Sequence, residues 1–328
     1  FWNKKGESPG GALHMKCAFV YAGQGSQKAG MGKDLYETYP VVRQVLDGLT
    51  LDFDLKALCF EGPEEQLAQT RYTQPCLAAY AVAVTEELRQ RGLRPAMVGG
   101  LSLGEYSALY AAGVFGAQQL LELVRFRGQA MERAAQGRPA KMAAMLGIGE
   151  EALAQAVEEA SQEGFVQICN YNCPGQIVIG GSAAGVDAAV ERAKAHGCRR
   201  AIPLAVSGAF HTAWMEPAAQ ELRQRLSSET LGPMECPAVH NVTGGVMQPG
   251  EDLRDLLVRQ VMSPVRWEAC IRTMEQAGVD TIVEIGPGHA LCGFIRKTAP
   301  QIKTVAIEDC ATLEQAVALL RGENHGES

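Results

Sequence analysis

A serine flanked by glycines stands where an apolar, strand-like run gives way to a helix-like run. The segment Gly100-Leu101-Ser102-Leu103-Gly104 follows residues 96–99 and leads into a helical pattern that extends to Ala112. This is the pattern of a nucleophile elbow, a tight strand-to-helix turn that holds a serine hydroxyl clear of a sheet. Glycines two residues before and after the serine leave room where a Cβ would collide. The adjoining helix N-terminus favours developing negative charge, so the pattern predicts nucleophilic catalysis by Ser102.

A serine hydroxyl is a poor nucleophile and needs a base within hydrogen-bond reach. Three of the six histidines lie away from the chain ends and from amphipathic helix ends: His211, His240 and His289. We favour His211, because it follows the apolar stretch 203–210, which breaks at Gly208, and is therefore expected at a strand end. Catalytic groups of open α/β sheets collect at such ends. By position alone, a core or helix-capping histidine is an equally good interpretation.

An arginine interrupts the apolar face of a predicted helix at 117–135. Leu120, Val124 and Met131 form the apolar stripe, and Arg127 falls in the middle of it. A cation that faces the interior must find a partner. The stripe leaves three alternatives open: a structural pair with a buried carboxylate, a side chain that snorkels to solvent, or a bidentate clamp on a substrate carboxylate.

The order of predicted elements indicates an α/β protein with two domains. Strands at 16–21, 96–100, 238–242 and 281–285 alternate with helices at 78–89, 103–112, 214–226 and 253–262. Between them, segments at 141–148, 150–163, 166–170, 176–180, 184–197 and 199–204 follow a β-α-β-β-α-β order. We therefore expect an α/β-hydrolase-like domain with a parallel sheet, and a smaller ferredoxin-like α+β domain inserted into it. The expected limits are 15–138 and 207–318 for the large domain and 139–206 for the small one.

The composition restricts the class of protein. The chain has 328 residues, is 47% hydrophobic and carries a net charge of −7, which argues against nucleic acid as the main ligand. No apolar run approaches the length of a membrane span. Ten scattered cysteines without metal-ligand spacing indicate reduced thiols and a cytoplasmic location. Residues 1–14 are expected to be a flexible tail before a natural start at Met15, and residues 319–328 a frayed end.

Seven short motifs, taken in order, carry a family resemblance. They are Gly-Gln-Gly-Ser-Gln at 23–27, Gly-Leu-Ser-Leu-Gly-Glu-Tyr-Ser at 100–107, Arg127 within Val-Arg-Phe-Arg-Gly, Asn-Tyr-Asn-Cys-Pro-Gly-Gln at 170–176, Gly-Ala-Phe-His at 208–211, Gln260 before Ser-Pro-Val-Arg-Trp at 263–267, and Glu-Ile-Gly-Pro-Gly at 284–288. Over residues 15–318 the chain resembles malonyl-CoA:acyl carrier protein transacylases of fatty-acid synthesis. It is also similar to the acyltransferase domains of polyketide synthases.

The resemblance implies a role for each matched residue. Ser102 would carry the malonyl group as an ester and His211 would act as its base, in a ping-pong reaction that needs no metal or bound cofactor. Backbone N–H groups of Gln24 and Leu103 would hold the oxyanion. The main-chain carbonyl of Gln260, and no Asp or Glu, would orient the histidine.

The substrate pocket is also implied by the resemblance. Arg127 would bind the malonyl carboxylate and so select malonyl over acetyl, because acetyl would leave the guanidinium unpaired. Phe210 would crowd an α-methyl group and disfavour methylmalonyl. Leu101 departs from the family, which usually has histidine there, so extender selectivity is expected to be looser. The remaining substrate-binding candidates are Met131 at the pocket floor, Asn170 and Asn172 near the CoA or phosphopantetheine arm, and His289 near the cleft.

Two other functions fit part of the pattern. A serine esterase or thioesterase would also use the elbow, but it would have no need of an arginine in an apolar stripe and would usually add an acidic triad member. A catalytically silent scaffold is opposed by the intact Ser102, His211 and Arg127. If the carrier protein is a partner, its acidic surface must meet local basic patches on an acidic chain. The candidates are Lys194, Arg199, Arg200, Arg296 and Lys297.

Overall fold

Two sheets organise the protein, which we describe from a computed structural model over residues 15–323. The first is parallel, with the strand order β2-β1-β7-β8. Its strands are β1 (Cys17–Tyr21), β2 (Met97–Gly100), β7 (Thr281–Ile285) and β8 (Lys303–Ile307). The second is antiparallel, with the order β4-β5-β3-β6. Its strands are β3 (Ala140–Leu146), β4 (Val166–Cys173), β5 (Gln176–Ser182) and β6 (Arg200–Leu204).

Both faces of the strands β2, β1 and β7 are buried, so apolar residues can stand at consecutive positions rather than at alternate ones, as they do in β1. Phe19 and Tyr21 enter the larger core, and Ala18 and Val20 enter a second core. The larger core packs against α5 (Thr70–Gln90), α6 (Leu103–Ala111) and α7 (Ala117–Ala135). The second core is closed by α12 (Trp267–Gln276) and α13 (Ala290–Thr298). The parallel sheet therefore lies between two layers of helices.

Further helices surround the larger core. These are α1 (Lys33–Thr38), α2 (Pro40–Gly48), α3 (Leu55–Glu61), α4 (Glu64–Leu67), α10 (Glu216–Ser227), α11 (Leu253–Gln260) and α14 (Cys310–Arg321), with a 3-10 turn at Ala213–Met215.

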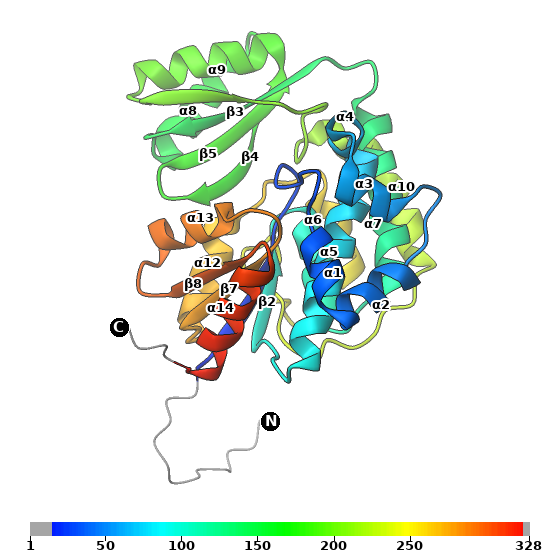
Figure 1. The fold of residues 1–328 in the computed structure, drawn as a ribbon. Helices are drawn as coiled ribbons and strands as arrows, with labels where there is room; N and C mark the ends of the chain where they lie inside the picture. The colour runs from blue at the N-terminus through cyan, green and yellow to red at the C-terminus, as the bar shows by residue number, and fades with distance from the viewer. Residues whose placement is uncertain (1–14, 324–328) are drawn as a thin grey trace.

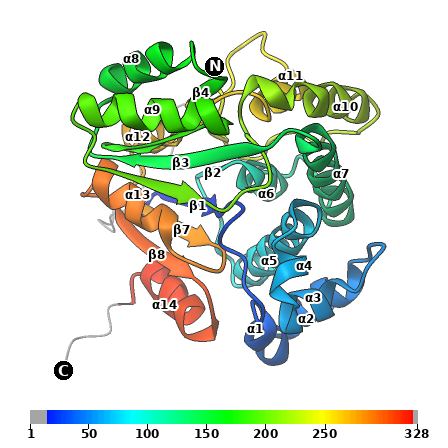
Figure 2. The ribbon, with the colours of Figure 1, turned by 90° about the horizontal axis from the view of Figure 1, so that it is seen from above.

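The antiparallel sheet has the strand order of a ferredoxin-like fold. Helices α8 (Glu150–Ala160) and α9 (Ala183–Ala195) pack on it around a third core of its own. In Figure 1 this unit lies at the top of the view, above the parallel sheet, and Figure 2 shows α8 and α9 side by side over β3. The α/β fold with an inserted antiparallel unit is confirmed. The residue limits given above for the two domains stay a prediction.

Several predicted elements need correction. A full strand at 238–242 is wrong: Ala238 and Val239 make only isolated bridges, because the chain turns back and the N–H of His240 donates to the carbonyl of Gly245. The helix expected from residue 78 begins at Thr70 and contains Pro75. Proline cannot donate to the carbonyl four residues earlier, and the Arg125 guanidinium donates to that carbonyl of Arg71 instead.

The expectations for the two ends of the chain fall only partly within the described residues. The predicted tail at 1–14 lies outside the described residues, as does 324–328. A frayed end from 319 is wrong, because residues 319–321 form the last turn of α14 and Gly322 caps that helix in a left-handed conformation. No helix between residues 15 and 323 is both long and apolar enough to cross a membrane.

Candidate active site

Ser102 occupies a strained turn between β2 and α6. Its φ of 56° and ψ of −108° are unusual for a residue that is not glycine. The turn closes so tightly that a Cβ on Gly100 would lie 2.0 Å from the carbonyl carbon of Gly104. A Cβ on Gly104 would lie 2.0 Å from the carbonyl oxygen of Tyr21. Both glycines are therefore required sterically, as the elbow pattern predicts.

His211 lies against the serine hydroxyl. Its Nε2 is 2.7 Å from Ser102 Oγ, and its Nδ1 is 2.9 Å from the carbonyl oxygen of Gln260. A carbonyl can only accept, so Nδ1 carries the proton. In the neutral imidazole, Nε2 is then free to accept the serine proton, which is the tautomer that a general base needs.

The position of His211 in the chain differs from the strand end that the sequence suggested. Strand β6 ends at Leu204, and His211 follows in an irregular segment with a φ of 60°. Burial, and next the positive charge of Arg127, lower the pKa of His211 to about 4. The imidazole is therefore neutral at pH 7.

Arg127 is completely buried beside the same hydroxyl. Its NH1 donates to Gln74 Oε1 at 2.9 Å, and its NH2 donates to Gln260 Oε1 at 2.9 Å and to Ser102 Oγ at 3.3 Å. The guanidinium also lies 5.1 Å from the ring centroid of Tyr106. Burial lowers the pKa of Arg127, although arginine stays charged at neutral pH.

The structure opposes two of the three alternatives for Arg127. It does not snorkel, because its side chain is wholly buried. Among residues 15–323, no carboxylate forms an ion pair with it, and its Nε has no hydrogen-bond partner. A buried cation held only by neutral groups, next to a nucleophile, is suited to bind an anionic group of a substrate.

The two predicted oxyanion donors lie on adjacent segments. Leu103 begins α6, so its N–H is one of those that a helix leaves without an internal acceptor. Gln24 lies on the turn after β1, and its side chain donates to Thr70 Oγ1 at 3.0 Å. The turn packs directly on the elbow, because a Cβ on Gly23 would lie 2.5 Å from the carbonyl oxygen of Leu101.

The other predicted substrate-binding residues are placed in different ways. Met131 is buried and its sulfur accepts from Gln74 Nε2 at 3.2 Å, next to Arg127. Phe210 is buried in the larger core, and Leu101 is half-buried at the elbow. Asn170 and Asn172 are buried on β4, where Asn170 bridges to Val265 and Asn172 Oδ1 has no partner among the described residues.

His289 and the five basic candidates lie on the surface. His289 precedes α13 with a side chain 72% exposed, and its Nδ1 is 3.4 Å from Glu308 Oε2. Within residues 15–323, no hydrogen bond joins it to the other predicted site residues. The basic candidates are all exposed: Lys194, Arg199, Arg200, Arg296 and Lys297. Lys194 pairs with Glu191 at 2.9 Å on its own helix.

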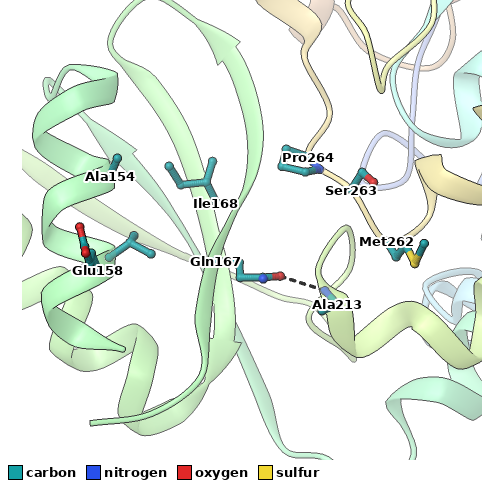
Figure 3. Close-up of a pocket in the computed structure, with 9 residues that line it drawn as sticks. Ala154, Glu158, Gln167, Ile168, Ala213, Met262, Ser263 and Pro264 are labelled. Carbon is teal, nitrogen blue, oxygen red and sulfur yellow. Dashed lines mark hydrogen bonds between the residues drawn. The ribbon is translucent and has the colours of Figure 1, made fainter. Parts of the chain in front are cut away.

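A cavity of about 410 Å³ lies along the seam between the antiparallel unit and the rest of the chain. Figure 3 shows its lining, which includes Gln167 and Ile168 of β4 and the segment 262–264. Gln167 Oε1 accepts from the N–H of Ala213, two residues after His211. None of the predicted site residues lines this cavity. The cavity therefore lies beside the site and is not part of it.

Four residues of the site escaped the sequence reasoning. Gln74 holds Arg127, and Asn241 Oδ1 accepts the N–H of Ser102 at 2.7 Å while its Nδ2 donates to the carbonyl of Gly100. Glu105 and Tyr106 follow the nucleophile on α6 and are buried. Glu105 and Tyr106 belong to the motif at 100–107, and Glu105 carried a signal of its own, since a carboxylate inside an apolar helix is unusual. Gln74 and Asn241 lie on other segments and carried none.

Comparisons with known proteins identify the family of this chain. The model of the acyl transferase domain family matches residues 18–318. The chain belongs to this family. It is 43% identical over 312 residues to the malonyl CoA-acyl carrier protein transacylase of Bacillus subtilis, covering 94% of this chain and 98% of that one.

Solved structures of this acyl transferase family agree in fold. The malonyl CoA-acyl carrier protein transacylase of Clostridium perfringens superposes with a TM-score of 0.90 at 36% identity, over 94% of this chain and 98% of that one. A malonyl-transacylase in complex with a type II polyketide synthase acyl-carrier protein gives a TM-score of 0.89 at 38% identity, over 94% and 99%.

Proposed function

We propose that this acyl transferase moves a malonyl group from malonyl-CoA to the phosphopantetheine thiol of an acyl carrier protein, and so supplies the extender unit of fatty-acid synthesis. The observation that carries the proposal is the position of Ser102 Oγ. It lies within reach of both a neutral histidine and a buried arginine that pairs with no carboxylate of residues 15–323. The relatives named malonyl CoA-acyl carrier protein transacylase support it.

The first half-reaction acylates Ser102. As Oγ attacks the thioester carbonyl, its proton passes to His211 Nε2. The resulting imidazolium is stabilised by the hydrogen bond from its Nδ1 to the carbonyl of Gln260. The N–H groups of Leu103 and Gln24 stabilise the oxyanion, each at about 2.7–4 kcal/mol by analogy with other oxyanion holes. When the C–S bond breaks, His211 returns the proton to the departing CoA sulfur.

The second half-reaction reverses these roles. The carrier thiol gives its proton to His211, its sulfur attacks the ester, and Ser102 leaves with that proton. Throughout, the Arg127 guanidinium holds the free carboxylate of the malonyl group. Met131 and Phe210 bound the acyl pocket, with Phe210 disfavouring an α-methyl group, while Asn170 and Asn172 meet the pantetheine arm.

These steps need no metal or bound cofactor, and that expectation stays a prediction. Within residues 15–323, no cluster of His, Cys, Asp or Glu is arranged to hold a metal ion. All ten cysteines are free thiols, in keeping with the proposed cytoplasmic location. Neither nucleic acid nor membrane is proposed as a partner.

The test is intact-mass analysis after incubation with malonyl-CoA. We expect a gain of one malonyl group, which Ser102→Ala abolishes, and transfer of that group when a phosphopantetheinylated carrier protein is added. Release of free malonate in place of transfer would identify a hydrolase instead. Absence of any adduct on the native chain would favour a silent scaffold. Loading of a polyketide carrier in preference to a fatty-acid carrier would reassign the pathway.

A further inference from the structure

A second buried charge lies close to the site and has no role in the proposed reaction. Glu105 is 1% exposed, on the first turn of α6. Its Oε2 accepts from Gln260 Nε2 at 2.9 Å and from the N–H of Asn241 at 3.2 Å, and its Oε1 accepts from His240 Nδ1 at 2.8 Å. Three donors of this kind stabilise an ionised carboxylate.

None of these donors neutralises the carboxylate. His240 is completely buried, and its Nε2 has no partner among the described residues. A protonated imidazole would therefore bury an N–H without an acceptor, which is costly. The neutral form, which donates from Nδ1 alone, satisfies the contacts that His240 makes. Within residues 15–323, Glu105 forms no ion pair with lysine or arginine.

The opposite charge lies one amide group away. Gln260 donates from Nε2 to Glu105, and through Oε1 it accepts from Arg127 NH2 at 2.9 Å. Because a carboxylate only accepts and a guanidinium only donates, the two charges fix which way the Gln260 amide points. Glu105 is also among the charges that act on the pKa of Arg127, in the direction that keeps it protonated.

On the basis of the proposed function, we infer that Glu105 is the counter-charge of Arg127, held off the guanidinium by the Gln260 side chain so that the donors of Arg127 stay available to the substrate carboxylate. A carboxylate in direct contact would stabilise the empty site better but would occupy those donors. With no carboxylate at all, the empty site would bury an uncompensated cation. Glu105 is thus a positioning residue, because it acts through Gln260.

Two variants should move substrate preference in opposite directions. Glu105→Gln keeps the shape and removes the charge, and its amide oxygen can still accept from Gln260 Nε2 and from the N–H of Asn241. Gln74→Glu places a carboxylate directly on Arg127, through the oxygen that already accepts from it. The first variant leaves Arg127 with only the substrate carboxylate to balance it, whereas the second gives it a permanent partner.

The measurement is the affinity for malonyl-CoA and for acetyl-CoA by calorimetry, with Ser102→Ala in every variant to prevent turnover. We expect the malonyl-over-acetyl preference to rise with Glu105→Gln and to fall with Gln74→Glu. Each change should be on the order of tenfold, because each variant alters one charge close to Arg127. Acetyl-CoA reports on CoA binding alone, so a merely structural loss would weaken both ligands together.

The outcomes separate this inference from the function on which it rests. If the Ser102→Ala protein itself binds malonyl-CoA no better than acetyl-CoA, the clamp and the inference both fail. If that protein prefers malonyl-CoA but Glu105→Gln leaves the preference unchanged or lowers it, only the inference fails. Glu105 would then serve only to stabilise the turn around Ser102. Should Glu105→Gln not fold, an unaltered preference in Gln74→Glu would overturn the inference, because a direct partner would then not compete with the substrate.

Discussion

Replacement of Arg127 by alanine should separate malonyl from acetyl loading. The guanidinium is buried and lies 3.3 Å from the nucleophile, and its Nε has no partner within residues 15–323. Two hydrogen bonds between charged groups, at about 1.5–3 kcal/mol each, give about 3–6 kcal/mol of lost stabilisation for the malonyl group. Because 1.4 kcal/mol corresponds to a factor of ten, kcat/KM for malonyl loading should fall by roughly 10²–10⁴.

Acetyl loading should respond differently. An acetyl group offers no acceptor to the guanidinium, so Arg127→Ala removes no contact to it, and its loading rate should stay within about tenfold of the native rate. Arg127→Lys is the matched control: it keeps the charge but loses the planar fork that binds a carboxylate at two points. Its malonyl loading should fall between the native and alanine values.

The assay is a competition between malonyl-CoA and acetyl-CoA, followed by the mass of the acyl-Ser102 adduct at early times. A thermal melt of each variant reports the loss of packing around Gln74, Gln260 and Tyr106, which Arg127 contacts. Equal losses of malonyl and acetyl loading would refute the reasoning. Arg127 would then support the fold of the site without binding the acyl carboxylate.

Three further predictions address the base, the elbow and the partner surface. Because the pKa of His211 is lowered to about 4, the neutral base persists below pH 6, and the acid limb of kcat/KM for acetyl loading should lie near pH 4; a limb near the ordinary histidine pKa of about 6.5 would contradict this. Gly104→Ala forces a Cβ to 2.0 Å from a β1 carbonyl and should prevent folding or lower the Tm strongly, whereas Gly48→Ala, with nothing within 4 Å, should not. Reversal of Arg199 and Arg200 to glutamate should raise the KM for the carrier protein and leave that for malonyl-CoA unchanged; an unchanged KM for the carrier would exclude these two residues.

The local features of the site were predictable because each requires particular residue types at neighbouring positions in the sequence. The glycines around Ser102 reflect two close backbone approaches, and Arg127 was visible as a cation inside an apolar helical stripe whose members are all buried. Helix α7 was predicted to its observed limits, 117–135, because its hydrophobic period is regular. Buried strand β1 was recognisable as a short, continuous apolar run.

The features that the sequence did not predict depend on contacts between distant segments. Asn241 bonds the N–H of Ser102 across 139 positions, and Gln74 meets Arg127 across 53. Neither has a local pattern that distinguishes it from a surface amide. His211 was named correctly as the histidine beside Ser102, yet for an imprecise reason, since it lies in an irregular segment and not at a strand end. The strand at 238–242 failed because apolar residues can pack beside β2 without extended pairing.

The use of a backbone carbonyl to orient His211 follows from the cation beside it. A carboxylate in the place of that carbonyl would put a negative charge into the same buried site as Arg127, where opposite charges attract strongly enough to favour a direct pair. Such a pair would take up the donors that an acyl carboxylate needs, and it would raise the pKa of His211 by stabilising the imidazolium. The carbonyl of Gln260 accepts the Nδ1 proton without adding a charge, while the side chain of the same residue separates Arg127 from Glu105. One residue therefore sets both the tautomer of the base and the availability of the cation, which is why a site built for a charged acyl group can dispense with an acidic third member.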